Sequence, residues 1–391
     1  MMLFTRQALA SSLGCALISL SAGCGQKPAG REESQLDVTS VVHSAVKRQS
    51  IGNCWLYAQG SWLESMLKHT NGSETNVSES YWTYWDLYEK LARGAEVTAS
   101  DSELNTGGSW GLASYLLKTY GWVEEKDFIP EEATMAMSDA QLCAQNYLNS
   151  AVKEDGTLAP SIPRTPELLK SELNKAFSCQ GRYTVDMDKT FPKQRSAAST
   201  LLKDRKTGEE RSLLQWMSAW TEVGHPGFFY WDQFEGKKLP SEYSLSRLDQ
   251  LGLRIRKALN DHQPVVLTFF VTFNAPDSKG LFNLKTLAEK NDYGTTGGHI
   301  VVLHDYTVKN VPGVGVLGEG DLPEEQKALA LQGTLDYVIV KNSWGANRVD
   351  RPWIGNGYSR ISWDYLTKTH YDAEDERFYP FLSSVVFPPG Y

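Results

Sequence analysis

The sequence predicts an α+β protein with two lobes, one mainly helical and the other mainly antiparallel sheet. The first part of the chain repeats apolar side chains at three- and four-residue spacing, which is typical of amphipathic helices. Residues 246–391 instead contain short β-branched and aromatic runs separated by turn residues, which is typical of strands. We expect the β lobe to be barrel-like and a substrate site to lie in the cleft between the lobes.

The helical lobe is expected to span residues 41–125. Three helices are predicted in it, at 54–69, 76–92 and 109–120, the second being rich in aromatic residues. Asn53 stands directly before the first helix as a candidate cap.

The β-rich lobe opens with a predicted helix at 247–260. The predicted strands of this lobe lie at 264–272, 299–306, 335–341, 357–362 and 382–387. Between the lobes, residues 126–245 form an insertion or crossover with helical stretches at 165–177 and 212–221. The sequence does not reveal the role of this insertion.

Composition limits the kind of protein and its partners. Of the 391 residues, 41% are hydrophobic and 11% aromatic, which argues against disorder. The formal net charge is −8 and no long Lys/Arg run occurs, so we do not expect nucleic acid as a partner. We expect no cofactor and no metal, and the oligomeric state stays open.

The first 24 residues predict an export signal. Arg6 supplies a positive charge, and residues 8–20 form a mostly apolar run that is too short to span a bilayer. The following Ser-Ala-Gly-Cys, ending at Cys24, is similar to the lipobox of bacterial lipoproteins, which implies lipidation of Cys24. Residues 25–40 are polar and are expected to form a flexible tether. We therefore expect an exported, membrane-anchored lipoprotein of a bacterial cell envelope or periplasm, with a plain secretory signal as the alternative.

The cysteines beyond the signal are Cys54, Cys143 and Cys179. An exported protein can form disulfides. Cys143 and Cys179 could pair and leave Cys54 free, on the condition that their Cα atoms approach within about 7 Å.

Cys54 is the candidate nucleophile. The thiolate is the reactive form, and an unperturbed thiol with a pKa of about 8.5 is only slightly ionised near neutrality. A position on the first turn of a helix lowers the thiol pKa, because the helix dipole favours negative charge there. Taken alone, a cysteine is more often a small buried hydrophobe.

A base and its partner are found in the second lobe. His299 follows two glycines and opens a predicted strand, where a side chain can project into a cleft. Asn342 ends another predicted strand, and its amide can accept from an imidazole N–H. Trp344, two residues on, could shield that hydrogen bond from water. Each residue alone also has an ordinary structural interpretation.

Together these segments resemble the papain superfamily of cysteine peptidases. Four blocks occur in family order: Gly52-Asn53-Cys54-Trp55, Asn105-Thr106-Gly107-Gly108-Ser109-Trp110, His299-Ile300-Val301-Val302-Leu303-His304-Asp305-Tyr306, and Lys341-Asn342-Ser343-Trp344-Gly345 with Gly355-Asn356-Gly357-Tyr358. The resemblance covers residues 48–122 and 248–365. The Cys-Trp context and the large insertion look somewhat closer to the bleomycin hydrolase branch than to papain itself.

The resemblance implies a role for each matching position. Cys54 would attack the scissile carbonyl and form a thioester, His299 would transfer the proton, and Asn342 would orient His299. Trp344 would cover that contact, and Gly107 and Gly108 would pair with the substrate backbone.

Gln49 is the matching candidate for the side chain that holds the oxyanion. It stands five residues before Cys54, whereas the family usually places this Gln six residues before. The expected substrate is a peptide or protein. The alternatives are an inactive papain-like scaffold and an acyl or amide transferase that uses the same thioester.

Overall fold

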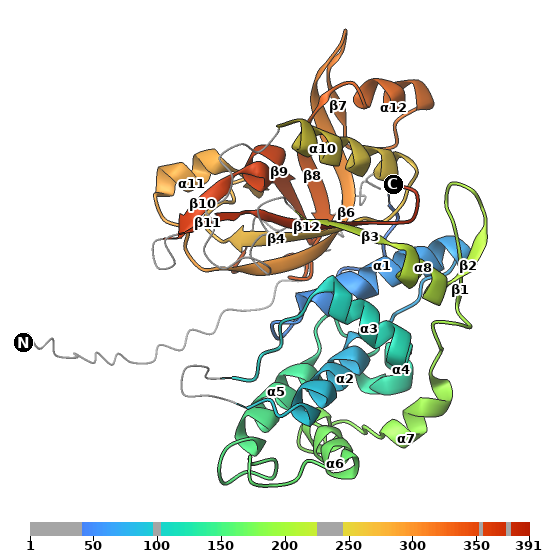
Figure 1. The fold of residues 1–391 in the computed structure, drawn as a ribbon, viewed down its shortest axis with the longest axis vertical. Coiled ribbons are helices and arrows are strands. Elements are labelled where there is room, and N and C mark those ends of the chain that lie inside the picture. The colour runs from blue at the N-terminus through green and yellow to red at the C-terminus, as the bar shows by residue number, and fades with distance from the viewer. Residues whose placement is uncertain (1–40, 97–102, 225–244, 352–354, 373–376) are drawn as a thin grey trace, which may run out of the picture. The chain divides into compact units, whose positions relative to one another are not determined.

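The computed structural model describes residues 41–96, 103–224, 245–351, 355–372 and 377–391 (Figure 1). The predicted signal with Cys24 and the predicted tether lie outside the described residues. Among the described helices, none is long and apolar enough to cross a membrane.

The three helices predicted in the first lobe are confirmed. They are α1 (Cys54–Asn71), α2 (Glu79–Ala92) and α3 (Trp110–Tyr120). Ser78 and Ser109 cap α2 and α3, each hydroxyl accepting from the backbone N–H three residues on. A side-chain cap of this kind satisfies one of the helix donors that would otherwise have no partner.

The central segment adds further helices. They are α4 (Glu125–Phe128), α5 (Asp139–Ala151), α6 (Pro166–Phe177), α7 (Met187–Thr190) and α8 (Leu213–Ala219), the third and last matching the two predicted stretches. Cys143 on α5 and Cys179 after α6 form a disulfide with their Cα atoms 5.2 Å apart, which meets the stated condition. The buried ring of Phe177 lies 5.5 Å from that of Tyr84 on α2, so this part of the central segment packs on the helical lobe.

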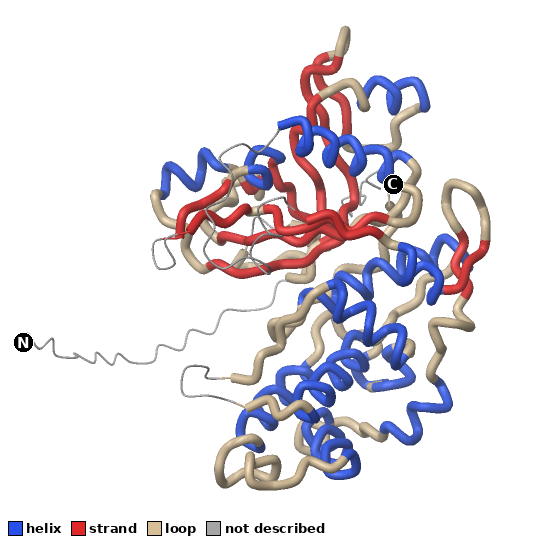
Figure 2. Tube along the Cα trace, in the orientation of Figure 1, coloured by secondary structure: helices blue, strands red, loops and turns tan. Residues whose placement is uncertain are grey.

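The second lobe is built on an eight-stranded sheet (Figure 2). Its order is β3 (Thr221–Gly224), β12 (Leu382–Phe387), β4 (Val266–Thr272), β6 (Thr296–Val311), β8 (Thr334–Lys341), β9 (Tyr358–Ser362) and β5 (Leu281–Phe282), with β7 (Gly315–Gly318) paired to β6. The helices of this lobe are α10 (Leu245–Asn260), α11 (Leu284–Lys290), α12 (Glu324–Ala330) and α13 (Trp363–Thr367). The small two-stranded sheets pair β1 (Leu201–Lys203) with β2 (Glu210–Ser212), and β10 (Thr369–Asp372) with β11 (Arg377–Pro380). All five predicted strands are confirmed.

The expectation of a barrel-like lobe is wrong. In the described residues the sheet is open, with β3 at one edge and the two-residue β5 at the other, and β5 pairs with β9 in parallel. A sheet can bury its apolar face against a layer of helices or by closing on itself. Here α10 and α13 cover one face, contributing Ile255, Leu259 and Leu366 to the core, so that closure is not needed.

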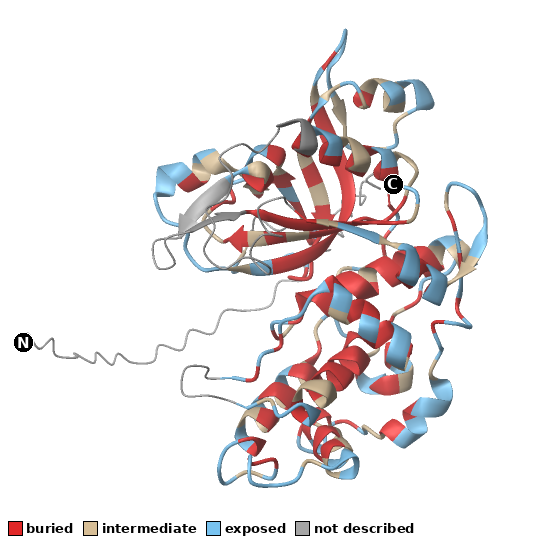
Figure 3. Cartoon of the chain, viewed as in Figure 1, coloured by how far each residue is buried: buried red, intermediate tan, exposed pale blue. Residues whose placement is uncertain are grey.

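The central strands are buried on both faces, which explains their continuous apolar runs. Along β6, Ile300 and Val302 belong to the core cluster shared with the helical lobe, whereas Val301 and Leu303 belong to the cluster under α10. This alternation follows the two-residue period of a strand. Figure 3 shows the buried residues along α1 and the centre of the sheet. Ile300 faces α1, whereas His299 has the parity of Val301 and lies on the other face, against Phe269 and Trp344.

Candidate active site

Cys54 is the first residue of α1 and is 8% exposed. Asn53 occupies the N-cap position, but its side chain makes no capping hydrogen bond. Burial raises the pKa of the Cys54 thiol, and the backbone N–H groups of Ile300, Trp55 and Cys54 itself counteract this rise. The contact with Ile300 places the sulfur beside β6, next to the residue that follows His299.

His299 is buried, and its Nε2 lies 2.9 Å from Asn342 Oδ1. The Asn342 amide is oriented by two further bonds: Nδ2 donates to Ser359 Oγ, and Oδ1 accepts from the Ser343 N–H. Because Oδ1 can only accept, Nε2 must carry the imidazole proton. The other ring nitrogen, Nδ1, is then the basic one.

Trp344 covers the His299–Asn342 contact. Its ring stacks on the imidazole with centroids 4.6 Å apart and an interplanar angle of 18°. The ring of Phe273 packs on Trp344 with centroids 5.2 Å apart, and the guanidinium of Arg351 lies over both Phe273 and Trp344. Such a cover would keep water from competing for the hydrogen bond.

Burial also sets the charge state of His299. It lowers the pKa of the imidazole to about 4, with a smaller opposing effect of the Asn342 hydrogen bond. Burial therefore disfavours both charged forms, the Cys54 thiolate and the His299 imidazolium. Passing the thiol proton to His299 would create two opposite charges within one buried site.

Solved structures align with most of the chain. PepW from Lactobacillus rhamnosis matches 90% of this chain and 82% of its own, with a TM-score of 0.46 and 14% identity. The Carica candamarcensis cysteine protease CMS1MS2 in complex with E-64 gives a TM-score of 0.31 and 15% identity, covering 88% and 92% of the two chains. The bromelain protease from Ananas comosus in complex with the E64 inhibitor gives 0.34 and 14%, covering 89% and 94%.

The chain is similar to these papain-like cysteine proteases. No family model and no curated protein matches it.

Gln49 lies next to this site despite its shifted position in the sequence. Its Nε2 donates to the Ile51 carbonyl at 2.8 Å, and its Oε1 accepts from the Ser343 hydroxyl at 2.6 Å. The backbone N–H of Gln49 also donates to the Ser343 carbonyl at 2.8 Å. The Gln49 amide thus joins the loop before Cys54 to the residue after Asn342. Nothing in the sequence indicated that Ser343 would contact Gln49.

The Gly107-Gly108 segment is held beside Trp55. The indole Nε1 donates to the Thr106 carbonyl at 3.0 Å. Lys90 donates to the carbonyls of Asn105 and Gly107, both at 2.9 Å. Both glycines are exposed, which leaves them accessible to an extended peptide. Sequence reasoning missed Lys90, because a lysine on a helix surface is usually only a solvated charge.

Replacing Gly108 by alanine should destabilise this segment. A Cβ at Gly108 would overlap the Trp55 ring, whereas a Cβ at Gly107 would meet only the Asn105 side-chain oxygen at 3.0 Å. We expect G108A to lower the free energy of unfolding by about 1–3 kcal/mol, the usual cost of overpacking. Urea unfolding checks this, with G107A as the matched control. Equal losses in the two variants would contradict the close packing of Gly108 on Trp55.

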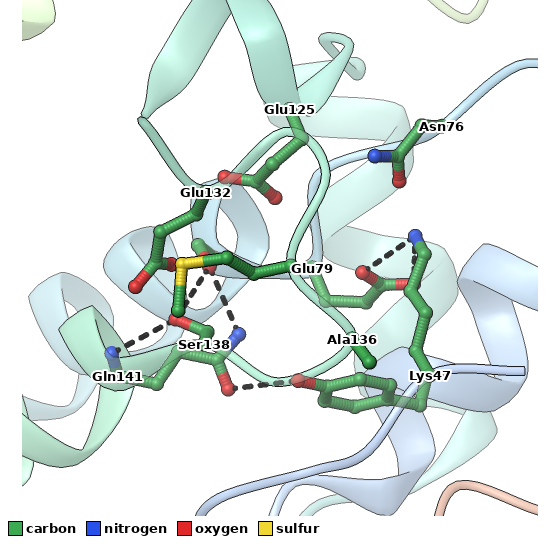
Figure 4. Close-up of a pocket in the computed structure, with 11 residues that line it drawn as sticks. Lys47, Asn76, Glu79, Glu125, Glu132, Ala136, Ser138 and Gln141 are labelled. Atoms are coloured by element: carbon green, nitrogen blue, oxygen red, sulfur yellow. Dashed lines mark hydrogen bonds and ion pairs between the residues drawn. The ribbon is translucent and has the colours of Figure 1, made fainter. Parts of the chain in front are cut away.

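A small polar pocket of about 20 Å³ is lined by residues of the helical lobe and of the central segment (Figure 4). This volume has room for about one water molecule. Its lining includes Lys47, Tyr57, Asn76, Glu79, Ser80, Glu125, Glu132, Ser138 and Gln141. Lys47 pairs with Glu79, whereas Glu125 Oε1 and Glu132 Oε2 are buried without a hydrogen-bond partner in the described part of the chain. Across the described ranges, no group of three His, Cys, Asp or Glu side chains could hold a metal ion.

Glu125 should make the protein sensitive to alkaline pH. Burial, reinforced by the charge of Glu79, raises its pKa from 4.5 to about 8. The folded state therefore holds a proton that the unfolded state has lost, and stability falls as pH rises from 4.5 through 8. We expect E125Q to exceed the wild type by about 3–5 kcal/mol in unfolding free energy at pH 9, with a smaller advantage at pH 5.

Urea unfolding from pH 5 to 9 measures this difference. The exposed neighbour Glu131 supplies the control, since E131Q should follow the wild-type profile. Parallel profiles for E125Q and the wild type would show that Glu125 is already ionised in the folded protein.

Proposed function

We propose that the chain is a thiol-dependent peptidase that uses Cys54 as nucleophile and His299 as base. One observation carries the proposal. Asn342 Oδ1 accepts a hydrogen bond from the Nε2–H of His299 and so leaves Nδ1 as the basic nitrogen, in a buried site where the strand residue after His299 contacts the Cys54 sulfur. This is the nucleophile, base and orienting group of covalent acyl transfer.

In the first half-reaction, Nδ1 of His299 takes the thiol proton, and the thiolate attacks the carbonyl carbon of the scissile bond. The oxyanion that develops is held by the backbone N–H of Cys54 and by Gln49, and one such donor is typically worth about 2.7–4 kcal/mol. The C–N bond breaks, the leaving amine takes the proton from His299, and Cys54 is left as a thioester.

In the second half-reaction, water replaces the amine. His299 accepts a proton from the water as its oxygen attacks the thioester carbon. The C–S bond then breaks, the proton returns to the sulfur, and the acid product leaves. Trp344, stacked on the imidazole, keeps His299 in the same orientation through both halves.

We further propose that this peptidase is exported and tethered by Cys24 to a bacterial membrane. The disulfide between Cys143 and Cys179 supports an oxidising compartment, since such bonds are rare in the cytosol. Mass analysis of the mature N-terminus tests the anchor. A diacylated Cys24 is expected, and an unmodified N-terminus would favour the plain secretory signal.

Product analysis tests the reaction. The purified protein is incubated with a peptide mixture under reducing conditions, with and without an added amine. We expect hydrolysed peptides in both cases, and no products with C54A. Amine-capped products in place of free acids would favour the transferase, and intact peptides would favour the inactive scaffold.

A further inference from the structure

The cap of α1 departs from that of its neighbours. Asn53 holds the N-cap position and is 1% exposed, yet its side chain makes no bond to the helix. Asn normally accepts from an N–H of the first turn, as the serines before α2 and α3 do here. The N–H of Leu56 donates to the Asn53 backbone carbonyl at 3.0 Å, and the N–H groups of Cys54 and Trp55 contact the Cys54 sulfur.

The Asn53 amide is held elsewhere by two hydrogen bonds. Its Nδ2 donates to Thr83 Oγ1 and to Gln141 Oε1, both at 2.9 Å. Its Oδ1 is buried and has no partner within the described chain. Leaving a buried oxygen without a hydrogen bond costs free energy. The two hydrogen bonds of Nδ2 must therefore stabilise this orientation more than a capping bond from Oδ1 to the helix would stabilise the alternative.

The side chain of Gln141 is itself held in place by hydrogen bonds. It is 1% exposed on α5, in the central segment whose role the sequence did not reveal. Its Oε1 also accepts from the Tyr57 hydroxyl at 3.3 Å, and its Nε2 donates to Ser80 Oγ at 3.0 Å. Figure 4 shows Gln141 in the cavity wall with both bonds drawn. A side chain fixed in this way can hold Asn53 in one orientation.

We infer that Gln141 is a positioning residue for the nucleophile: it holds the Asn53 amide away from the first turn of α1, so that the N–H groups there face the sulfur and the developing oxyanion. The oxyanion half of this inference rests on the proposed peptidase function. The half that concerns the Cys54 sulfur does not, because it follows from the helix end alone.

Without Gln141, Asn53 can turn its Oδ1 to the first turn and cap α1 as Asn usually does. The thiolate and the oxyanion then both lose hydrogen bonds from the N–H groups of the first turn. A merely structural role for Gln141 would instead lower the amount of folded protein and leave the reactivity of each folded molecule unchanged.

The test measures the alkylation rate of Cys54 by iodoacetamide from pH 5 to 10, with the adduct mapped to Cys54 by peptide mass. For Q141L we expect labelling about tenfold slower at pH 7, and a midpoint at least about half a pH unit higher. With a peptide substrate and titrated active sites, kcat should fall about tenfold while KM stays within about twofold. If Q141L does not fold, Q141M serves in its place.

Gln145 gives a matched control one turn along the same helix. It is also buried, and its Nε2 donates to Glu103 Oε2 at 2.8 Å, away from Asn53. Q145L should keep the wild-type labelling midpoint. The double variant N53A/Q141L should regain most of the rate lost in Q141L, because an alanine at the N-cap position has no side-chain oxygen with which to cap α1.

The outcomes separate the two proposals. A wild-type protein that hydrolyses no peptide but shows the Q141L shift in labelling overturns the peptidase function and supports the positioning role. An active wild type whose midpoint and kcat are unchanged in Q141L overturns the positioning role. A double variant that is labelled more slowly than Q141L also overturns the positioning role.

Discussion

Replacing Cys54 by serine should lower kcat/KM for peptide hydrolysis by at least about 10⁴-fold. Removing one member of a group that acts as a unit typically removes most of the rate enhancement. Serine has nearly the same size, and the N–H of Ile300 that contacts the sulfur can bond its hydroxyl. We therefore expect the thermal midpoint to stay within a few degrees of the wild type, measured by circular dichroism alongside activity.

The double variant C143S/C179S provides the comparison for the loss of a cysteine elsewhere. It opens the disulfide, which closes a loop with a sequence separation of 36 residues, and such bonds typically contribute about 2–4 kcal/mol. It should melt earlier but keep its activity per folded molecule. Activity retained in C54S, or abolished in well-folded C143S/C179S, would contradict the assignment of the nucleophile.

Replacing His299 by glutamine should have an effect of similar size. The amide of Gln can still donate to Asn342 Oδ1, which lies 2.9 Å from the imidazole Nε2, but it cannot take a proton from Cys54. The orientation of Asn342 is thus preserved while the base is lost. We expect kcat/KM to fall by about 10³-fold or more.

His304 on the same strand is the matched control. It is buried, bonds the Val41 carbonyl through Nδ1 at 3.1 Å and packs on Tyr358. H304Q should retain kcat/KM within a few fold per folded molecule. If both variants lose activity equally, the loss reflects damage to β6 and not removal of the base.

Local pattern in the sequence was sufficient for the helices of the first lobe and for the five longest strands, but not for α5 or for short elements such as α4 and β5. The apolar spacing that begins at Cys54 predicted α1, and the run ending at Lys341 predicted β8 with Asn342 after it. Each of these segments is short, and its own apolar pattern indicates its secondary structure. The order of the blocks then placed Cys54 with His299 and Asn342.

Features that depend on contacts between distant segments were not predictable. The open sheet depends on α10 covering one face, which no strand shows by itself. The bond between Asn53 and Gln141 joins residues 88 positions apart, across a segment without recognisable motifs. The same holds for Lys90 at Gly107, because a helix surface lysine carries no sign of its partner.

Covalent labelling tests the central claim most directly. The mature protein and H299Q are treated with an epoxide thiol probe at pH 6, and the adduct is mapped by peptide mass. We expect the wild type to label rapidly and only at Cys54, and H299Q to label at least about 100-fold more slowly. Wild-type labelling as slow as that of an ordinary exposed thiol, or equally fast in H299Q, would contradict a Cys54 nucleophile activated by His299.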